Sequence, residues 1–327
     1  MKSARNTAVA WAMAAAFLPM IGEANAQVAF TGIQALGDSY VDNGNLFKIL
    51  GVPNPPQYPT GRFSGGTNFV DTTSVLLGGI PITNVAIGGA KTGTTNTVAP
   101  GVPGFTQEWQ GLVAAGVKIE PSDLVEINIG GNDARAYYQG GGTLAGVPAA
   151  ATVSATQALA GINALVGLGA KTIVFTTGDV GQLPEAAGNP NAPIGSAYSQ
   201  AYNAQMQVAL AAIAKSGVRV ELVDIGAIGA LIKADPAKYN LVSAGACPLA
   251  CIGNPALQNQ FLFYFDALHL TSHGFAILGE YIVNRLNAPL TFAPQGDAAM
   301  NSAMGFASTL FGRLDTFARP TASPPRR

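Results

Sequence analysis

The chain contains two histidines, His269 and His273, so a histidine base could only be one of these two residues. Asp266 lies three residues before His269, a spacing at which a carboxylate in a turn can reach the imidazole ring. That carboxylate would accept the Nδ1 proton and leave the other ring nitrogen free to take a proton from a hydroxyl. Ser39, which follows the apolar run VAFTGIQALG, is the candidate hydroxyl. As the residue after a strand end, Ser39 could equally be an ordinary turn residue.

A metal site is the competing interpretation of the two histidines. His269 and His273 are four residues apart, a spacing that suits two ligands on one helix. However, Thr271 or Ser272 is a natural N-cap for the helix expected to follow, which would leave His269 outside that helix. The chain also lacks an HExxH pattern. We therefore expect no metal, and a packing or hydrogen-bonding role for His273 in the first helical turn.

Hydrolysis by a serine also needs hydrogen-bond donors for the oxyanion that develops on the substrate. Gly89 can present an unobstructed backbone N–H, Asn132 carries a side-chain amide, and the backbone N–H of Ser39 is a third donor. Each residue has an ordinary alternative role, glycine in a turn and asparagine in a loop cap. Other nucleophile and nucleotide motifs are absent: the chain has no GxSxG, no GxxxxGK[ST], and no GxGxxG after a strand.

The elements expected around these residues alternate between strands and helices. Because the apolar strands are continuous and separated by helical patterns, they predict a parallel sheet covered on both faces, an α/β layered domain. Ligands bind such sheets beyond the carboxyl ends of the strands, where Ser39, Gly89 and Asn132 fall. The expected strands are 28–36, 82–87, 123–129, 171–177 and 219–225, and the expected helices are 67–78, 105–116, 150–168, 196–215 and 272–286.

Composition excludes one class of partner and predicts the chain's destination. Charged residues make up 11% of the 327 residues and the net charge is −1, so no nucleic-acid partner is expected. Residues 1–26 have the pattern of a secretory signal peptide: Lys2 and Arg5, then an apolar run, then small residues up to Ala26. We expect an exported protein, secreted, periplasmic or at the cell surface, with no other stretch long and apolar enough to span a bilayer.

The remaining chain divides into a domain over 27–290 and a tail over 291–327. The tail pattern predicts an amphipathic helix with a disordered end, which would dock on or connect to another element. Cys247 and Cys251 lie close together, and in an oxidising compartment they are expected to form a disulfide that closes a short loop. A redox-active pair is the alternative, although the spacing is not CxxC.

Four widely separated blocks of the chain resemble the GDSL esterases and lipases, also called SGNH hydrolases. These are GDSYVDNGN, NVAIGGA, IGGNDA and FDALHLTSHGF, and YPTGRFSGG resembles a further segment of many members. The resemblance spans residues 28–290 and implies a three-layer α/β/α fold with a short, flavodoxin-like parallel sheet. It also implies Ser39 as nucleophile, His269 as base and Asp266 as its orienter. Leu270 departs from the family, where a proline usually follows the histidine.

The resemblance further implies that Ser39, Asn132 and Gly89 form the oxyanion hole, with Gly88 as the other candidate glycine. The sequence thus predicts an exported serine carboxylic-ester hydrolase that acts on an ester or lipid substrate and needs no cofactor. The alternative is a catalytically inactive, exported or surface-displayed interaction domain on the same scaffold, because fold alone does not guarantee function. Long-chain lipids, short acyl esters, acetylated sugars and lysophospholipids all remain candidate substrates.

Overall fold

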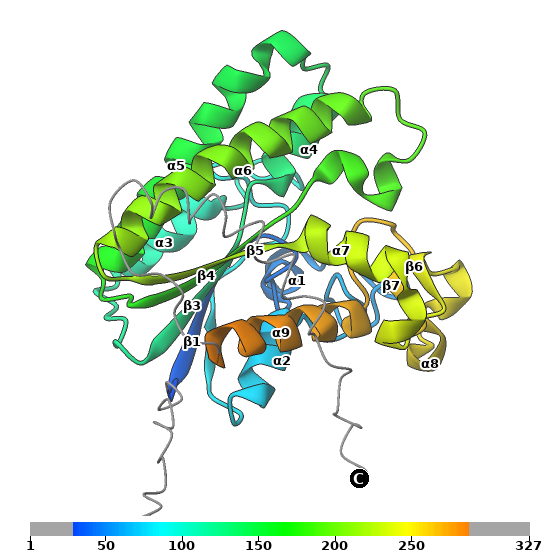
Figure 1. Cartoon of the computed structure of the whole chain (residues 1–327), viewed down its shortest axis with the longest axis horizontal. Coiled ribbons are helices and arrows are strands. Elements are labelled where there is room, and N and C mark those ends of the chain that lie inside the picture. Colours follow the sequence, from blue (N-terminus) through cyan, green and yellow to red (C-terminus); the bar gives the residue numbers. More distant parts are fainter. Residues whose placement is uncertain (1–28, 288–327) are drawn as a thin grey trace, which may run out of the picture.

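The computed structural model describes residues 29–287, and a parallel five-stranded sheet forms the centre of this part of the chain (Figure 1). All neighbouring strands are parallel, in the order β2-β1-β3-β4-β5. This order reverses direction between β1 and β3, and the carboxyl ends of those strands flank the crevice in which ligands of such sheets bind. The strands are β1 Gly32–Gly37, β2 Ile82–Asn84, β3 Asp123–Asn128, β4 Thr172–Thr177 and β5 Arg219–Asp224.

Helices cover both faces of the sheet, as Figure 1 shows, which is why the inner strands are buried along nearly their whole length. One layer contains α3 Phe105–Ala114, α4 Gly131–Gln139, α5 Val147–Gly167 and α6 Ala192–Lys215. The opposite layer contains α2 Phe69–Leu76 and α9 Ser272–Asn287, which pack against each other. The predicted three-layer α/β/α fold is confirmed.

The helix α5, together with the turn before it, is long and apolar enough by length and composition to cross a membrane. The expectation that no stretch after the N-terminal one would pass that test was therefore wrong for Leu144–Gly167. In the structure α5 packs against α6 and α3, so its apolar side chains contribute to the helix layer that covers one face of the sheet.

A small lobe lies beyond the carboxyl edge of the sheet, on the right in Figure 1. It contains α7 Ile225–Ala234, α8 Pro255–Gln258 and a second parallel sheet of β6 Ser243–Ala246 and β7 Phe261–Phe263. Cys247 and Cys251 form a disulfide in this lobe and pack with Tyr264 in a small buried cluster.

The expected strands occur where the sequence places them. β2, β3 and β5 end earlier than expected because their apolar runs continue into the loops that follow, whereas β1 and β4 begin later than expected. The missed elements are short or Gly-rich: α4, the lobe, and α1 Asn45–Leu50. The predicted signal peptide, residues 1–26, and the predicted helical tail, residues 291–327, lie outside the described residues.

Candidate active site

Ser39, His269 and Asp266 lie in hydrogen-bonded series at the carboxyl edge of the sheet. Ser39 is the second residue after the end of β1, and its Oγ lies 2.7 Å from Nε2 of His269. Nδ1 of the same ring lies 2.6 Å from Oδ2 of Asp266. Because an ionised carboxylate only accepts hydrogen bonds, Nδ1 carries the proton and Nε2 accepts from the serine hydroxyl. The series thus has the order and polarity that nucleophile activation requires.

The carboxylate of Asp266 is held in place by four donors. Its Oδ1 accepts the backbone N–H groups of Leu268 and His269 at 3.0 and 2.9 Å. Its Oδ2 accepts the Tyr58 hydroxyl at 2.7 Å in addition to the His269 ring. Burial alone would raise the pKa of Asp266, but the charge and hydrogen bonds of His269 and the Tyr58 bond lower it to about 2. Asp266 therefore stays ionised and can stabilise an imidazolium.

Aromatic side chains that the sequence analysis did not single out enclose the His269 ring. The ring of Phe63 lies 4.7 Å from it, centroid to centroid, and the ring of Tyr40 lies 5.8 Å from it. The Tyr40 hydroxyl also donates to the carbonyl of Leu268 at 2.7 Å, which ties the histidine loop to the serine loop. Tyr58 and Phe63 come from loop 51–66, whose Pro- and Gly-rich composition carries no sign of where its side chains point.

His273 does not join this series. It lies in the first turn of α9, and its Nε2 lies 3.0 Å from the carbonyl oxygen of Tyr239. The Thr271 hydroxyl accepts the N–H of Gly274 at 3.0 Å, so Thr271 caps the helix and His269 stays outside it. Within residues 29–287, no cluster of three or more His, Cys, Asp or Glu side chains is arranged to hold a metal ion.

In the loop after β2, one of the two adjacent glycine amides has no acceptor among the described residues. The Gly88 N–H donates to Oδ2 of Asp42 at 2.8 Å and is therefore occupied. The Gly89 carbonyl accepts from the backbone N–H and hydroxyl of Thr97, at 2.8 and 3.0 Å. Among the described residues no acceptor takes the N–H of Gly89. Gly89 has φ 79°, and a Cβ there would lie 2.5 Å from Oδ1 of Asn96, so glycine is required.

Asn132 and Ser39 carry two further donors that lack an acceptor within residues 29–287. Asn132 lies in the first turn of α4, is 7% exposed, and donates one amide hydrogen to the carbonyl of Ala90 at 3.1 Å. Its second amide hydrogen remains for another acceptor. The backbone N–H of Ser39 has no acceptor within the described part of the chain. The segments that follow β1, β2 and β3 thus each contain one donor without an acceptor among the described residues.

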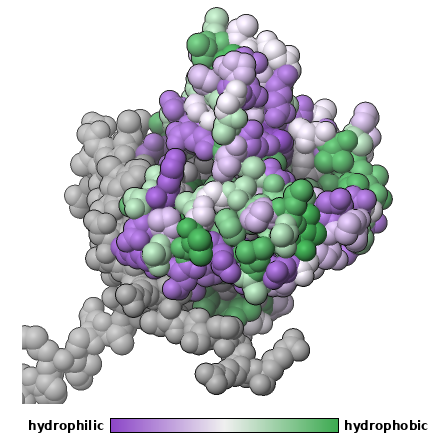
Figure 2. All heavy atoms as spheres, turned by 90° about the vertical axis from the view of Figure 1, so that its right-hand side faces the viewer, coloured by the Kyte–Doolittle hydropathy of each residue, from purple (hydrophilic) through white to green (hydrophobic). Residues whose placement is uncertain are grey.

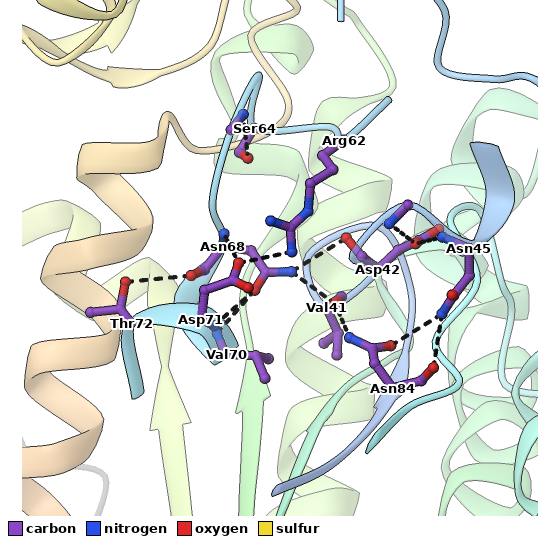
Figure 3. A network of polar contacts seen from close by, with 12 residues as sticks. Val41, Asp42, Asn45, Arg62, Ser64, Asn68, Val70, Asp71, Thr72 and Asn84 are labelled. Atoms are coloured by element: carbon purple, nitrogen blue, oxygen red, sulfur yellow. Dashed lines mark hydrogen bonds and ion pairs between the residues drawn. The ribbon is translucent and has the colours of Figure 1, made fainter. Parts of the chain in front are cut away.

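A polar network lies behind these loops and connects three of the blocks noted in the sequence (Figure 3). Nδ2 of Asn45 donates to the carbonyls of Asn84 and Ala86, both at 3.0 Å. Nδ2 of Asn84 and Nδ2 of Asn68 both donate to the Val41 carbonyl at 2.8 Å. These bonds hold the serine loop against the glycine loop, because the amides satisfy backbone carbonyls that neither strand ladder reaches.

Two buried carboxyl groups flank the end of β1. Burial raises the pKa of Asp38 to about 7, although the Tyr40 backbone N–H, which donates to it at 3.1 Å, acts in the opposite direction. Glu108 of α3 is 6% exposed, and burial raises its pKa well above the usual value despite two backbone N–H donors. Charged groups in this environment are costly unless hydrogen-bonded.

A cavity of about 810 Å³ opens next to Ser39 and runs across the ends of β3 and β4 to α7 and β6. Ser39 and Asn132 line it, whereas His269 and Gly89 are not among the described residues that do. Its apolar walls include Ile129, Val180, Ile225, Val242, Phe263 and Leu268. A pocket of this size and lining suits an organic ligand with a sizeable apolar part.

Fold and site define a three-layer α/β/α protein with a serine, histidine and aspartate in series beside unoccupied amide donors. Residues 33–282 match the family model described as GDSL-like Lipase/Acylhydrolase. The chain belongs to this family, as its sequence blocks predict, and it is a hydrolase of ester bonds.

The chain is similar to two curated proteins over about three quarters of its length. It is 29% identical over 251 residues to the phosphatidylcholine-sterol acyltransferase of Aeromonas hydrophila, covering 73% of this chain and 70% of that protein. It is 27% identical over 269 residues to a Pseudomonas putida protein of the trpE-trpG intergenic region, covering 76% of this chain. The match spans 41% of the length of the Pseudomonas putida protein.

Among solved structures, the chain is similar to an acetylxylan esterase from Geobacillus stearothermophilus. The TM-score is 0.45 and the sequence identity 17%, over 79% of this chain and 95% of the other.

Proposed function

We propose that this protein is an exported serine ester hydrolase in which Ser39, His269 and Asp266 are the catalytic residues. The observation that carries the proposal is the continuous hydrogen-bonded series from Ser39 Oγ through the His269 ring to Asp266. In the proposed reaction, Ser39 Oγ attacks the ester carbonyl carbon while Nε2 of His269 takes the hydroxyl proton. The chemistry requires no metal or organic cofactor.

The oxyanion of the tetrahedral intermediate is held by the Ser39 and Gly89 backbone amides and the free Asn132 amide hydrogen. His269 then donates its proton to the leaving alcohol oxygen as the carbon–oxygen bond breaks, which leaves the acyl group on Ser39. Water, deprotonated by His269, attacks this acyl-enzyme, and the reverse proton transfer restores the serine and frees the acid. The ionised Asp266 stabilises the imidazolium in both halves of the cycle.

The cavity is proposed to receive the acyl part of the substrate. The leaving oxygen must face Nε2 of His269 to receive its proton, so the leaving alcohol occupies the His269 side of Ser39. The cavity is lined by Ser39 and Asn132 but not by His269, and this lining supports its assignment to the acyl side. Its outer end reaches Val242, which is 72% exposed, in the lobe that faces the viewer in Figure 2. An apolar wall and rim favour acyl chains of several carbons over acetyl groups.

The decisive test combines Ser39→Ala with a fluorophosphonate probe and p-nitrophenyl esters. Wild type is expected to be labelled at Ser39 and to lose hydrolysis in proportion to labelling, because only an activated serine reacts. Ser39→Ala is expected to fold with unchanged circular dichroism and to lose turnover by at least about 10³-fold. The matched control is Ser243→Ala, which alters another serine lining the cavity and is expected to retain activity. Unlabelled wild type without turnover would favour the inactive interaction domain instead.

Export is proposed from the signal-like pattern of residues 1–26, and the Cys247–Cys251 disulfide supports it, since disulfides persist in oxidising compartments. Mass spectrometry of the protein recovered from a bacterial host's periplasm or medium should find a chain that begins after Ala26. A cell-bound chain that keeps its first residues would contradict this part of the proposal.

A further inference from the structure

Glu108 occupies a position in α3 where an apolar residue is expected. The buried positions of α3 are Phe105, Glu108 and Leu112, which share one face of the helix that covers the sheet. Burying a carboxyl group in an apolar face is unfavourable unless it gains strong hydrogen bonds. Departures of this kind from the apolar pattern concentrate at functional sites.

The two carboxyl oxygens of Glu108 bind two different strand ends. Oε2 accepts the N–H of Gly37 at 2.7 Å, and Oε1 accepts the N–H of Ile87 at 3.2 Å. Gly37 is the last residue of β1, two residues before Ser39, and Ile87 follows β2, two residues before Gly89. One side chain from a third segment thus contacts both loops that carry proposed oxyanion donors, at the same offset in each.

Glu108 makes these two bonds at the point where the segments that continue β1 and β2 stop pairing with each other. The last backbone bond between them is from the Ile87 N–H to the Gly37 carbonyl at 3.0 Å. Beyond this bond, the backbone amides of Ser39 and Gly89 have no acceptor among residues 29–287. To bind one oxyanion together, their two nitrogen atoms must lie at a defined distance from each other. The direct bond joins Gly37 to Ile87, two residues before each donor, and the Ile87 N–H is shared between the Gly37 carbonyl and Oε1 of Glu108.

Asp42 supports the same loop from the other side but cannot replace this contact. It accepts the N–H of Gly88 at 2.8 Å and the N–H groups of Gly44, Asn45 and Leu46 in its own loop. Asp42 therefore fixes the turn at Gly88, whereas Glu108 fixes the strand ends from which both loops leave.

We propose that Glu108 is a positioning residue for ester hydrolysis: its carboxyl group bridges Gly37 and Ile87 and, together with the direct bond between these residues, sets the distance between the Ser39 and Gly89 oxyanion donors. This inference rests on the proposed serine mechanism. Loss of one oxyanion donor costs about 10²- to 10³-fold in kcat, and a displaced donor costs a fraction of that. Because the donors act on the tetrahedral intermediate, displacement lowers kcat with little change in KM.

The experiment compares Glu108→Gln and Glu108→Asp with wild type. Glu108→Gln replaces one acceptor by an NH₂ group that faces a backbone N–H, and Glu108→Asp withdraws the carboxylate by one carbon. For both variants, kcat per fluorophosphonate-labelled serine on a p-nitrophenyl ester is expected to fall about 10- to 100-fold, with KM within about threefold. The acid side of the pH–rate profile should keep its midpoint, because the His269–Asp266 pair is untouched.

Glu126→Gln is the matched control, because Glu126 is another fully buried glutamate, on β3, that contacts neither loop. It should leave kcat per labelled serine within about twofold of wild type. Dividing by labelled serine keeps the measurement valid for a variant that folds only in part. The inference would be overturned if both Glu108 variants kept wild-type kcat, or if Glu126→Gln lost as much kcat as they do. It would also be overturned if the Glu108 variants changed only in KM. Failure of the serine mechanism itself would appear separately, as wild type that is not labelled.

Discussion

The imidazole of His269 lies 2.7 Å from the hydroxyl of Ser39, although 230 positions separate the two residues in the chain. The serine loop leaves the first strand of the sheet, and the histidine loop precedes the last helix, so packing of the complete domain brings them together. The Tyr40 hydroxyl, bound to the Leu268 carbonyl, adds a second connection between the same two loops. Substitutions of Ser39, His269 or Asp266 are therefore expected to reduce activity far more than substitutions of neighbouring residues.

The two histidines are expected to differ strongly when each is replaced. His269→Ala removes the proposed base, so kcat should fall by at least about 10³-fold. His273→Ala removes one hydrogen bond to the Tyr239 carbonyl, and should cost about 1 kcal/mol of stability with kcat within about fivefold of wild type. Steady-state kinetics and urea unfolding of both variants test this. An equal loss of kcat in the two would reopen the interpretation of the pair as metal ligands.

Replacing Asp266 is expected to lower kcat much more than replacing Tyr58, which only donates a hydrogen bond to it. Asp266→Asn keeps a similar shape but removes the charge that stabilises the imidazolium, so kcat should fall by about 10³- to 10⁴-fold. Tyr58→Phe removes one of four hydrogen bonds to the carboxylate, and kcat should fall less than about tenfold. The comparison is made by kcat/KM on one ester at fixed pH. A Tyr58→Phe loss as large as that of Asp266→Asn would give the tyrosine a direct role that the geometry does not predict.

Narrowing the cavity should discriminate between acyl chains. Gly229 lies in α7 and lines the cavity, and a Cβ added there meets no atom within 4 Å, so Gly229→Leu can extend into the open space. We expect kcat/KM for decanoyl esters to fall about tenfold or more, while acetyl esters change less than about twofold. Gly111→Leu is the matched control, in an exposed helical position of α3 that also meets no atom within 4 Å and does not line the cavity. Uniform loss across chain lengths would place the acyl group elsewhere.

The buried carboxyl of Glu126 should make stability depend on pH. Neither of its buried oxygens has a well-formed hydrogen bond in the described part of the chain, and burial raises its pKa to about 8, although the nearby Thr73 hydroxyl acts in the opposite direction. Between its unfolded pKa and about 8 the folded state binds the extra proton, so the free energy of unfolding falls as pH rises. From about pH 5 to about pH 7 this group alone should remove about 3 kcal/mol.

Glu126→Gln should lack this loss, because its side chain cannot ionise. Its stability relative to wild type is therefore expected to increase with pH over the same range, as measured by urea unfolding at several pH values. If the difference in free energy of unfolding between Glu126→Gln and wild type does not vary with pH, the pKa of Glu126 is not raised in the folded protein, which would contradict this prediction.

Local patterns in the sequence were enough to predict the layered fold and to name the side chains that meet at the sheet edge. Continuous apolar strands can only be buried in a sheet covered on both faces, and polar residues that follow them must then gather at one edge. The scarcity of histidine reduced the candidate bases to two, and a helix cap expected at Thr271 or Ser272 predicted which one stays outside the helix. Tyr58, Phe63 and the distinction between Gly88 and Gly89 depend on irregular loops, whose side-chain directions no periodicity encodes.

The sequence by itself determined which residue types were available and in what order, because strand burial and helix capping are local properties of a few neighbouring residues. Only the tertiary structure decided which of the amides remain free to bind an oxyanion, since that depends on every acceptor contributed by distant segments. Glu108 shows the difference clearly: in the sequence it is one charged residue in a helix, and in the fold it joins two strand ends.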